Sequence, residues 1–238
     1  DEALEVLEKA CENHGAHPAI KVSEAEVFKS KGDYDKAIEL YKEIIDEFPD
    51  NGPLLINYAL CLQEVSRFEK SEKVYRQAIE VEEDPRVAIS NYLMGLHYNP
   101  QNSKDFIFEE HKKHGREFNP KEKVEQVNPL DINVNKKLRI GFISSGFRRH
   151  PVGWMIAGAL EQLVDDNFEL YCYTTDNRFD FITRRIHRNI DHWESVIGYS
   201  DKVIGNIIRE DDLDILVDLT GHAADNCMNV MAHKPAPI

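Results

Sequence analysis

Apolar residues in the N-terminal part of the chain recur at intervals of three and four, which places them on one face of a helix. The clearest run is Ala37, Leu40, Tyr41, Ile44 and Ile45. This pattern returns 34 positions later, where Tyr75 corresponds to Tyr41 and Ile79 to Ile45. Small residues occupy the positions where two helices would approach closely. Aromatic residues occupy positions from which their side chains would fill the space between the helices. The pattern therefore predicts stacked pairs of helices.

The repeat is similar to a known family of helical repeats. Its period and the segment Gly32-Asp33-Tyr34-Asp35-Lys36-Ala37-Ile38, followed by Phe48-Pro49, resemble tetratricopeptide repeats. Shifting the register back by one period maps Ala37 onto Ala3 and Tyr41 onto Leu7. We therefore expect the chain to open inside the second helix of an earlier repeat, with more repeats before residue 1.

The repeat pattern ends near residue 100. The first helix of a third repeat is predicted over residues 85–97, and the repeat pattern is lost at residues 99–102. Ser103 is the predicted N-cap of an extra helix over residues 104–118. The buried residues of that helix would be Phe106, Ile107 and Phe118.

The C-terminal half has a different pattern, in which short apolar runs alternate with amphipathic stretches after a polar connector over residues 119–135. Strands are predicted over residues 138–143, 168–173, 192–196 and 213–219, and helices over 153–164, 181–189, 202–209 and 226–233. This alternation favours a parallel sheet with helices on both faces. The predicted domains are an α-helical solenoid of repeats (1–100), a linker helix and connector (101–136) and an α/β domain (137–238).

Charge and cysteine content limit the possible partners. The chain has a net charge of −14, and residues 1–100 carry 21 acidic against 11 basic groups, so we expect no nucleic-acid partner. No signal peptide or membrane-length apolar run is visible, so no membrane partner is expected. The cysteines are far apart, and three of them (Cys11, Cys61, Cys172) fall on apolar positions. They indicate reduced structural thiols in a cytoplasmic protein.

Histidine pairs at metal-binding spacing occur twice, as His14 with His17 and His111 with His114. Neither pair has a carboxylate or thiol cluster nearby in sequence that would complete a ligand set. We therefore predict no metal site.

The candidate site follows from the predicted sheet. In open parallel sheets, ligands bind outside the carboxyl ends of the strands. The loop 144–151 and the loop 220–223 both leave such ends, so His150 and His222 are expected on one rim. Gly153 lies at a predicted helix N-terminus, which favours anionic ligands.

Other residues of these loops leave the reaction open. Arg148 and Arg149 could neutralise a diphosphate, although exposed loop arginines are common. A loop histidine such as His150 has either a chemical role in the reaction or a purely structural one. Trp154 and Trp193 are interpreted as packing residues. The first loop has neither a dinucleotide-binding nor a phosphate-loop motif, which argues against a classical dehydrogenase or nucleotide hydrolase.

The order of these segments resembles glycosyltransferase family 41, the protein O-linked N-acetylglucosamine transferases and Spindly-type O-fucosyltransferases. The matching segments are residues 138–147 with His150-Pro151, then residues 214–222 and Lys234-Pro235-Ala236-Pro237-Ile238. The resemblance implies a Rossmann-like first lobe of a GT-B fold. It also implies transfer of a sugar, such as N-acetylglucosamine from UDP-GlcNAc or fucose from GDP-fucose, to Ser or Thr of proteins. No metal cofactor is implied, and the repeats would bind the protein acceptor.

The resemblance also suggests residue roles. His150 aligns with a histidine on the acceptor side, which either accepts the hydroxyl proton or orients substrate. Thr220, Gly221 and His222 match a loop that lines the sugar pocket, while Arg149 and Gly153 are further substrate-binding candidates. Asp225-Asn226-Cys227 departs from the more basic family pattern at that place. The family has a second lobe that holds most nucleotide contacts, so we expect these 238 residues to be inactive alone.

Two other functions remain open at this point. The chain could be a non-catalytic adaptor, with repeats that bind proteins and a degenerate α/β domain. It could also be a GT-B enzyme that acts on a carbohydrate or lipid acceptor. The sequence does not decide between these alternatives and a protein glycosyltransferase.

Overall fold

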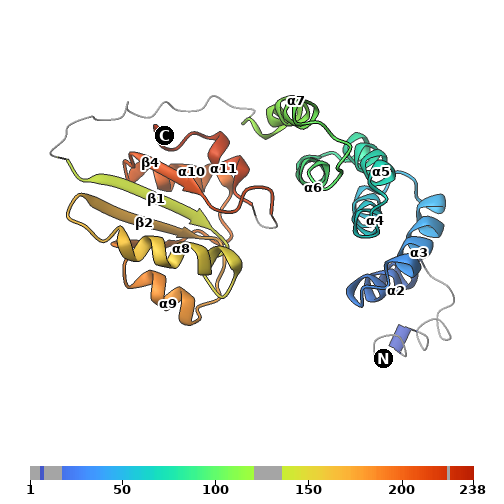
Figure 1. Ribbon diagram of the computed structural model, residues 1–238, viewed down its shortest axis with the longest axis horizontal. Coiled ribbons are helices and arrows are strands. Elements are labelled where there is room, and N and C mark those ends of the chain that lie inside the picture. The colour runs from blue at the N-terminus through green and yellow to red at the C-terminus, as the bar shows by residue number, and fades with distance from the viewer. Residues whose placement is uncertain (1–5, 8–17, 121–135, 224–225) are drawn as a thin grey trace. The chain divides into compact units, whose positions relative to one another are not determined.

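The structure is a computed structural model that describes residues 6–7, 18–120, 136–223 and 226–238. It divides into two compact units, residues 1–117 and 118–238 (Figure 1). Most of the predicted connector lies outside the described residues, as do Ala3, Cys11, His14, His17 and Asp225.

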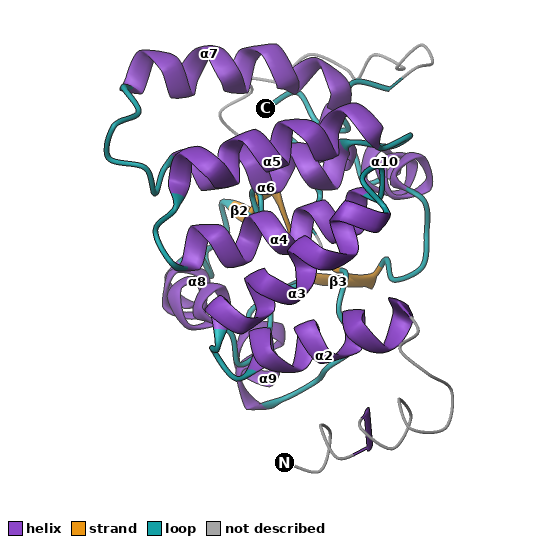
Figure 2. Cartoon of the chain, turned by 90° about the vertical axis from the view of Figure 1, so that its right-hand side faces the viewer, coloured by secondary structure: helices purple, strands orange, loops and turns teal. Residues whose placement is uncertain are grey.

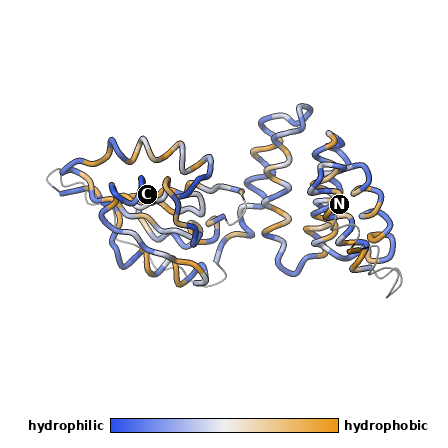
Figure 3. Tube along the Cα trace, turned by 90° about the horizontal axis from the view of Figure 1, so that it is seen from below, coloured by the Kyte–Doolittle hydropathy of each residue, from blue (hydrophilic) through white to orange (hydrophobic). Residues whose placement is uncertain are grey.

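The first unit is built of paired helices, as predicted (Figure 2). The helices are α2 (Pro18–Ser30), α3 (Tyr34–Glu47), α4 (Gly52–Glu64), α5 (Phe68–Val81), α6 (Arg86–Leu96) and α7 (Lys104–His114). Orange and blue positions alternate along the helical part of the tube, as expected for helices with one apolar face (Figure 3). Side chains of Asp33, Asn51 and Ser103 accept backbone N–H bonds at the starts of α3, α4 and α7. The predicted Ser103 cap is thereby confirmed.

Small buried residues allow the paired helices to approach. Ala25, Ala37 and Ala59 are fully buried, and the Ser71 hydroxyl donates to the Ala59 carbonyl oxygen at 2.7 Å. Tyr41 and Tyr75 are buried between the helices, as the repeat pattern predicts.

The extra helix is shorter than predicted. α7 ends at His114, and a 3-10 helix, η1, continues over Gly115–Phe118. Phe118 is buried, whereas Phe106 and Ile107 are only partly buried. Gly115 at the C-cap of α7 keeps a right-handed helical conformation, with φ −58° and ψ −23°, so the chain continues directly into η1.

The second unit contains a four-stranded sheet in which every pairing is parallel, in the order β3-β2-β1-β4. The strands are β1 (Leu138–Ser144), β2 (Phe168–Thr174), β3 (His192–Ser195) and β4 (Ile215–Asp218). The helices are α8 (Pro151–Gln162), α9 (Phe181–His187), α10 (Asp201–Glu210) and α11 (Met228–Ala232). The α/β fold predicted from the sequence is confirmed.

Alternate residues of the strands build a core on each face of the sheet. Phe142 and Cys172 pack with residues of α8 and α9, whereas their neighbours Ile143 and Tyr173 pack with residues of α10 and α11. The two helical layers lie on opposite sides of the sheet (Figure 1). This arrangement follows from the period of two in a strand.

The described cysteines are buried: Cys61, Cys172 and Cys227. Within the described residues, no helix is long and apolar enough to cross a membrane.

Candidate functional site

The candidate site lies at the carboxyl edge of the sheet. β1 and β4 are parallel neighbours, with Ile143 opposite Asp218 in the register. The loops that follow them therefore leave the same edge, as the sequence predicts. The arrowheads of β1 and β2 point to this edge (Figure 1).

Ser144 joins the two loops. Its buried hydroxyl oxygen accepts a hydrogen bond from the Gly146 backbone N–H at 2.9 Å. The Thr220 hydroxyl donates to the same oxygen at 3.3 Å. A residue at the last position of β1 therefore fixes both the start of the first loop and the side chain of Thr220.

The second loop is held by the last residue of β4. The Asp218 carboxylate accepts the backbone N–H groups of Thr220 at 2.9 Å and Gly221 at 3.0 Å. Gly221 has a φ of 56°, a left-handed conformation that favours glycine. His222 is partly buried, and its ring makes an edge contact with Phe118 at 6.4 Å. Thr220, Gly221 and His222 thus form a defined turn.

His150 is the N-cap of α8. Its Nδ1 accepts a hydrogen bond from the Val152 backbone N–H at 3.3 Å, and Pro151 occupies the first helical position. α8 therefore begins at Pro151 rather than at Gly153 as predicted, because a proline is well suited to the first turn of a helix. A neutral imidazole whose Nδ1 accepts a bond carries its proton on Nε2. In this geometry, His150 can donate a hydrogen bond from Nε2.

The first loop folds tightly over the start of α8. A Cβ atom on Gly153 would lie 2.1 Å from the Arg148 carbonyl oxygen and 2.7 Å from that of Gly146. A Cβ atom on Gly146 would lie 3.1 Å from Nδ1 of His150. The space at both glycines is therefore taken up by the loop itself. The substrate-binding role of Gly153 stays a prediction.

The two loop arginines have different environments. The Arg148 guanidinium is mostly buried and donates to Asp176 at 3.0 Å. Arg178 also donates to Asp176, and these bonds hold the pKa of that carboxyl well below its usual range despite its burial. Arg149 is exposed, and only its backbone N–H is fixed, by a 2.6 Å bond to Asp180. The exposed guanidinium of Arg149 is the better placed of the two to meet an anionic ligand.

No group of three or more His, Cys, Asp or Glu side chains that could hold a metal ion occurs in the described part of the chain. His111 does not pair with His114. Its Nε2 lies 3.3 Å from Nε2 of His97, whereas His114 contacts the ring of Tyr92 and lies 3.7 Å from Glu110.

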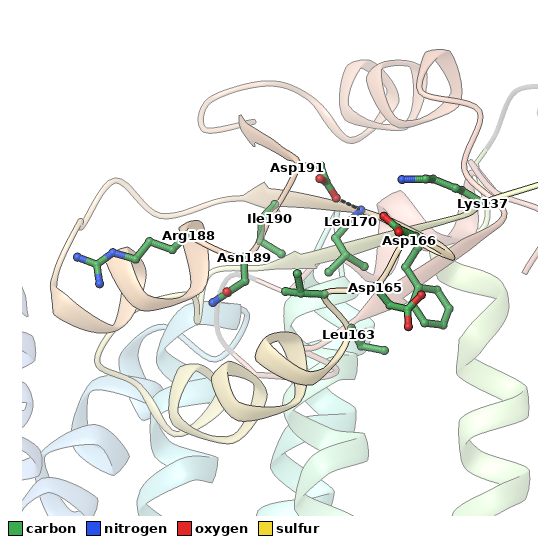
Figure 4. Close-up of a pocket in the computed structure, with 11 residues that line it drawn as sticks. Lys137, Leu163, Asp165, Asp166, Leu170, Arg188, Asn189, Ile190 and Asp191 are labelled. Carbon is green, nitrogen blue, oxygen red and sulfur yellow. Dashed lines mark hydrogen bonds between the residues drawn. The ribbon is translucent and has the colours of Figure 1, made fainter.

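A cavity of about 540 Å³ lies at the other edge of the sheet (Figure 4). Its lining includes Lys137 and Phe168, beside the starts of β1 and β2, and Asp191, just before β3. The Asp191 carboxylate accepts the Leu170 backbone N–H at 2.8 Å (Figure 4). Because this cavity is at the amino ends of the strands, it is separate from the His150 loop.

Comparisons with known proteins agree with this layout. A tetratricopeptide repeat model matches residues 29–90, and the model described as "Glycosyl transferase family 41" matches residues 120–238. The rice protein "Probable UDP-N-acetylglucosamine--peptide N-acetylglucosaminyltransferase SPINDLY" is 28% identical over 181 residues, which cover 70% of this chain and 18% of that protein. The protein of the same name from Eustoma exaltatum is 30% identical over 166 residues, 67% of this chain and 18% of that protein.

Among solved structures, a mutant of Thermobaculum terrenum O-GlcNAc transferase has the same fold. Its TM-score is 0.79 at 24% identity, and the match covers 98% of this chain and 45% of that one. The chain thus spans 18% of the length of these plant relatives and under half of this solved structure.

Proposed function

The chain belongs to glycosyl transferase family 41, and we propose that it acts as a glycosyltransferase that moves a sugar from a nucleotide donor to Ser or Thr hydroxyl groups of proteins. N-acetylglucosamine carried by UDP is the proposed donor, because the SPINDLY relatives are named for UDP-N-acetylglucosamine and a peptide. The main support is the family match together with the joined loops of His150 and Thr220 at one edge of the sheet.

The reaction has specific chemical needs. The acceptor hydroxyl oxygen attacks the anomeric carbon of the sugar, the bond to the diphosphate oxygen breaks, and the hydroxyl proton passes to water or to an oxygen of the departing diphosphate. The enzyme must therefore orient the nucleophile and stabilise charge on the departing diphosphate.

We assign His150 to orientation. Because its Nδ1 accepts from Val152, the neutral ring presents an N–H at Nε2, which can hold an oxygen atom of the acceptor or the sugar. Acting as a base through Nδ1 would require this N-cap bond to break. Thr220, Gly221 and His222 are proposed to line the sugar site, and Arg149 to face the diphosphate.

The repeats are proposed to bind the acceptor polypeptide along their concave face. We also propose a cytoplasmic location, which the buried thiols of Cys61 and Cys172 support. No metal is assigned to the reaction, so EDTA treatment of the full-length protein is expected to leave transfer unchanged. Loss of transfer on chelation, with recovery on adding Mg²⁺ or Mn²⁺, would contradict that assignment.

The test of the site uses two substitutions at His150 in the full-length protein. Asparagine is among the best N-cap residues, so His150→Asn should preserve α8 while removing the imidazole. His150→Ala should remove both the N-cap hydrogen bond and the imidazole. Transfer of labelled sugar from UDP-GlcNAc to protein should fall by about 10²-fold in both variants, because the reacting groups lose their orientation. Wild-type transfer by His150→Asn would exclude an imidazole role, and no transfer by the wild-type protein with any donor would favour a binding function.

A further inference from the structure

A group of exposed aromatic and basic side chains lies beside the His150 loop. We define the arginine-aromatic patch as Arg149, Trp154, Phe179, Phe181 and Arg184. The three aromatic side chains are 52%, 58% and 49% exposed in that order. Exposed aromatic groups that cluster in this way commonly mark an interaction surface. The interpretation of Trp154 as a packing residue is wrong, whereas Trp193 does pack partly buried against the core beneath α8 and α9.

One ring contact and two backbone hydrogen bonds link residues of the patch. The rings of Trp154 and Phe181 make an edge contact, with centroids 5.5 Å apart. Asp180 lies between Phe179 and Phe181 in sequence and accepts the Arg149 backbone N–H at 2.6 Å. Arg184 donates its backbone N–H to the Asp180 carbonyl oxygen, so it lies one helical turn further along α9.

The charge of the patch is positive although the chain is acidic overall. The Asp180 carboxylate is occupied by backbone N–H groups, from Arg149 on one oxygen and from Ile182 and Thr183 on the other. These bonds outweigh the opposing effect of burial and lower the pKa of Asp180, which stays ionised as a helix cap. Within the described residues, neither the Arg149 nor the Arg184 guanidinium has an ion-pair partner.

We propose that the arginine-aromatic patch binds an acidic segment of the acceptor polypeptide next to its modified hydroxyl. The Arg184 guanidinium would pair with Asp or Glu side chains, and Trp154 and Phe181 would contact an apolar residue among them, while Arg149, at the edge of the patch, stays assigned to the diphosphate. Arg149 immediately precedes His150, so a segment on this surface would lie beside the candidate site. The inference rests on the proposed function, since it names the class of acceptor that the same site takes.

The test compares two labelled peptides with the full-length protein. Both contain a Ser and a Phe; one has Asp and Glu around them, and the other has Asn and Gln at the same positions. Fluorescence anisotropy without donor sugar measures binding, and a second assay with UDP-GlcNAc measures kcat/KM.

Arg184→Glu should weaken binding of the acidic peptide by about tenfold or more and leave the amide peptide unchanged, and the effect should shrink at high salt. Trp154→Ser should weaken binding of both peptides. Arg188→Glu is the matched control, because Arg188 is also an exposed arginine at the end of α9 but lines the cavity at the opposite edge (Figure 4). It should behave as wild type.

The outcomes separate this inference from the proposed function. Equal binding of the two peptides, or equal effects of Arg184→Glu and Arg188→Glu, would overturn the docking surface even if sugar is transferred. Displacement of the acidic peptide by an equal concentration of inorganic phosphate would reduce the patch to a general anion site and also overturn it. Patch-dependent binding without any transfer would keep the surface and remove the enzymatic proposal.

Discussion

At the scale of single residues, the candidate site depends on a loop that folds back on its own helix. Gly153 sits where a Cβ atom would meet the Arg148 carbonyl oxygen at 2.1 Å. We expect Gly153→Ala to lower the free energy of unfolding of the second unit by about 3 kcal/mol, because a backbone atom must move. Gly158, in the same helix, has no atom within 4 Å of an added Cβ.

Gly158→Ala is therefore the matched control for Gly153→Ala. It should raise stability by about 0.5–1 kcal/mol, because alanine favours a helix more than glycine does. Urea unfolding followed by circular dichroism checks both variants. Equal changes would show that the loop does not press on Gly153.

Asp176 makes the stability of the same loop dependent on pH. Hydrogen bonds from Arg178 and the ion pair with Arg148 hold the pKa of Asp176 well below its usual range. A carboxyl whose pKa is lowered by folding stabilises the protein above its unfolded pKa, and that stability is lost as the pH falls below about 4. Arg148 and Arg178 would have no carboxylate partner at this position in Asp176→Asn.

We expect Asp176→Asn to be less stable than wild type by about 2 kcal/mol at pH 7. The stability difference between the two proteins should narrow as the pH falls below about 4, since Asp176 is then protonated in the unfolded wild-type chain while it is still ionised in the folded one. Urea midpoints at pH 7 and pH 3 measure this change. Glu161→Gln, which removes a more exposed partner of Arg185, should have a smaller effect. A constant gap between wild type and Asp176→Asn across this pH range would show that Asp176 does not titrate with folding.

Single residues also show where sequence reasoning ends. Asp214 follows Asp211 and Asp212, which end α10 and form a turn, and its place just before a strand suggests the same role. Instead it is buried, pairs with Lys136 at 3.0 Å and accepts the Arg139 backbone N–H at 2.9 Å. Those partners are far away in sequence. A local pattern carries no information about them.

At the scale of elements, periodicity predicts the helices and strands well and their ends less well. The order of every described strand and helix of the α/β unit follows the prediction. β4, however, spans only Ile215–Asp218 of the predicted run, because its pairing with β1 extends no further. Caps are predictable where the side chain is a common one, as with Ser103. His150 is an unusual N-cap residue, so its cap was missed.

The repeat packing gives a prediction at this scale. Ala59 is fully buried, and its carbonyl oxygen accepts the Ser71 hydroxyl, so α4 and α5 are in close contact there. We expect Ala59→Leu to destabilise the first unit by about 1–3 kcal/mol, because the added atoms have no space. Ala19→Leu, at an exposed position of α2, should change stability by less than about 0.5 kcal/mol. Thermal unfolding of both variants measures the difference.

At the scale of the whole molecule, the chain joins two kinds of core. The repeats bury residues of neighbouring helices, as in the cluster around Tyr41 and Leu62. The α/β unit buries both faces of its sheet. Each set of core residues belongs to one unit. The sequence could predict this division because the hydrophobic period changes from helical spacing to short strand runs. It could not predict which exposed side chains gather into a surface, because that depends on how the loops fold.

Two cores with separate residues should unfold as two transitions in calorimetry of the 238-residue chain. Leu62 and Ile143 are fully buried, one in each unit. Replacing either with Ala should cost about 2–5 kcal/mol and lower the midpoint of its own transition by roughly 8–20 °C. Leu62→Ala should leave the transition of the α/β unit in place, and Ile143→Ala that of the repeats. If each substitution moved both transitions by the same amount, the units would be one cooperative domain, and the site loops would depend directly on the packing of the repeats.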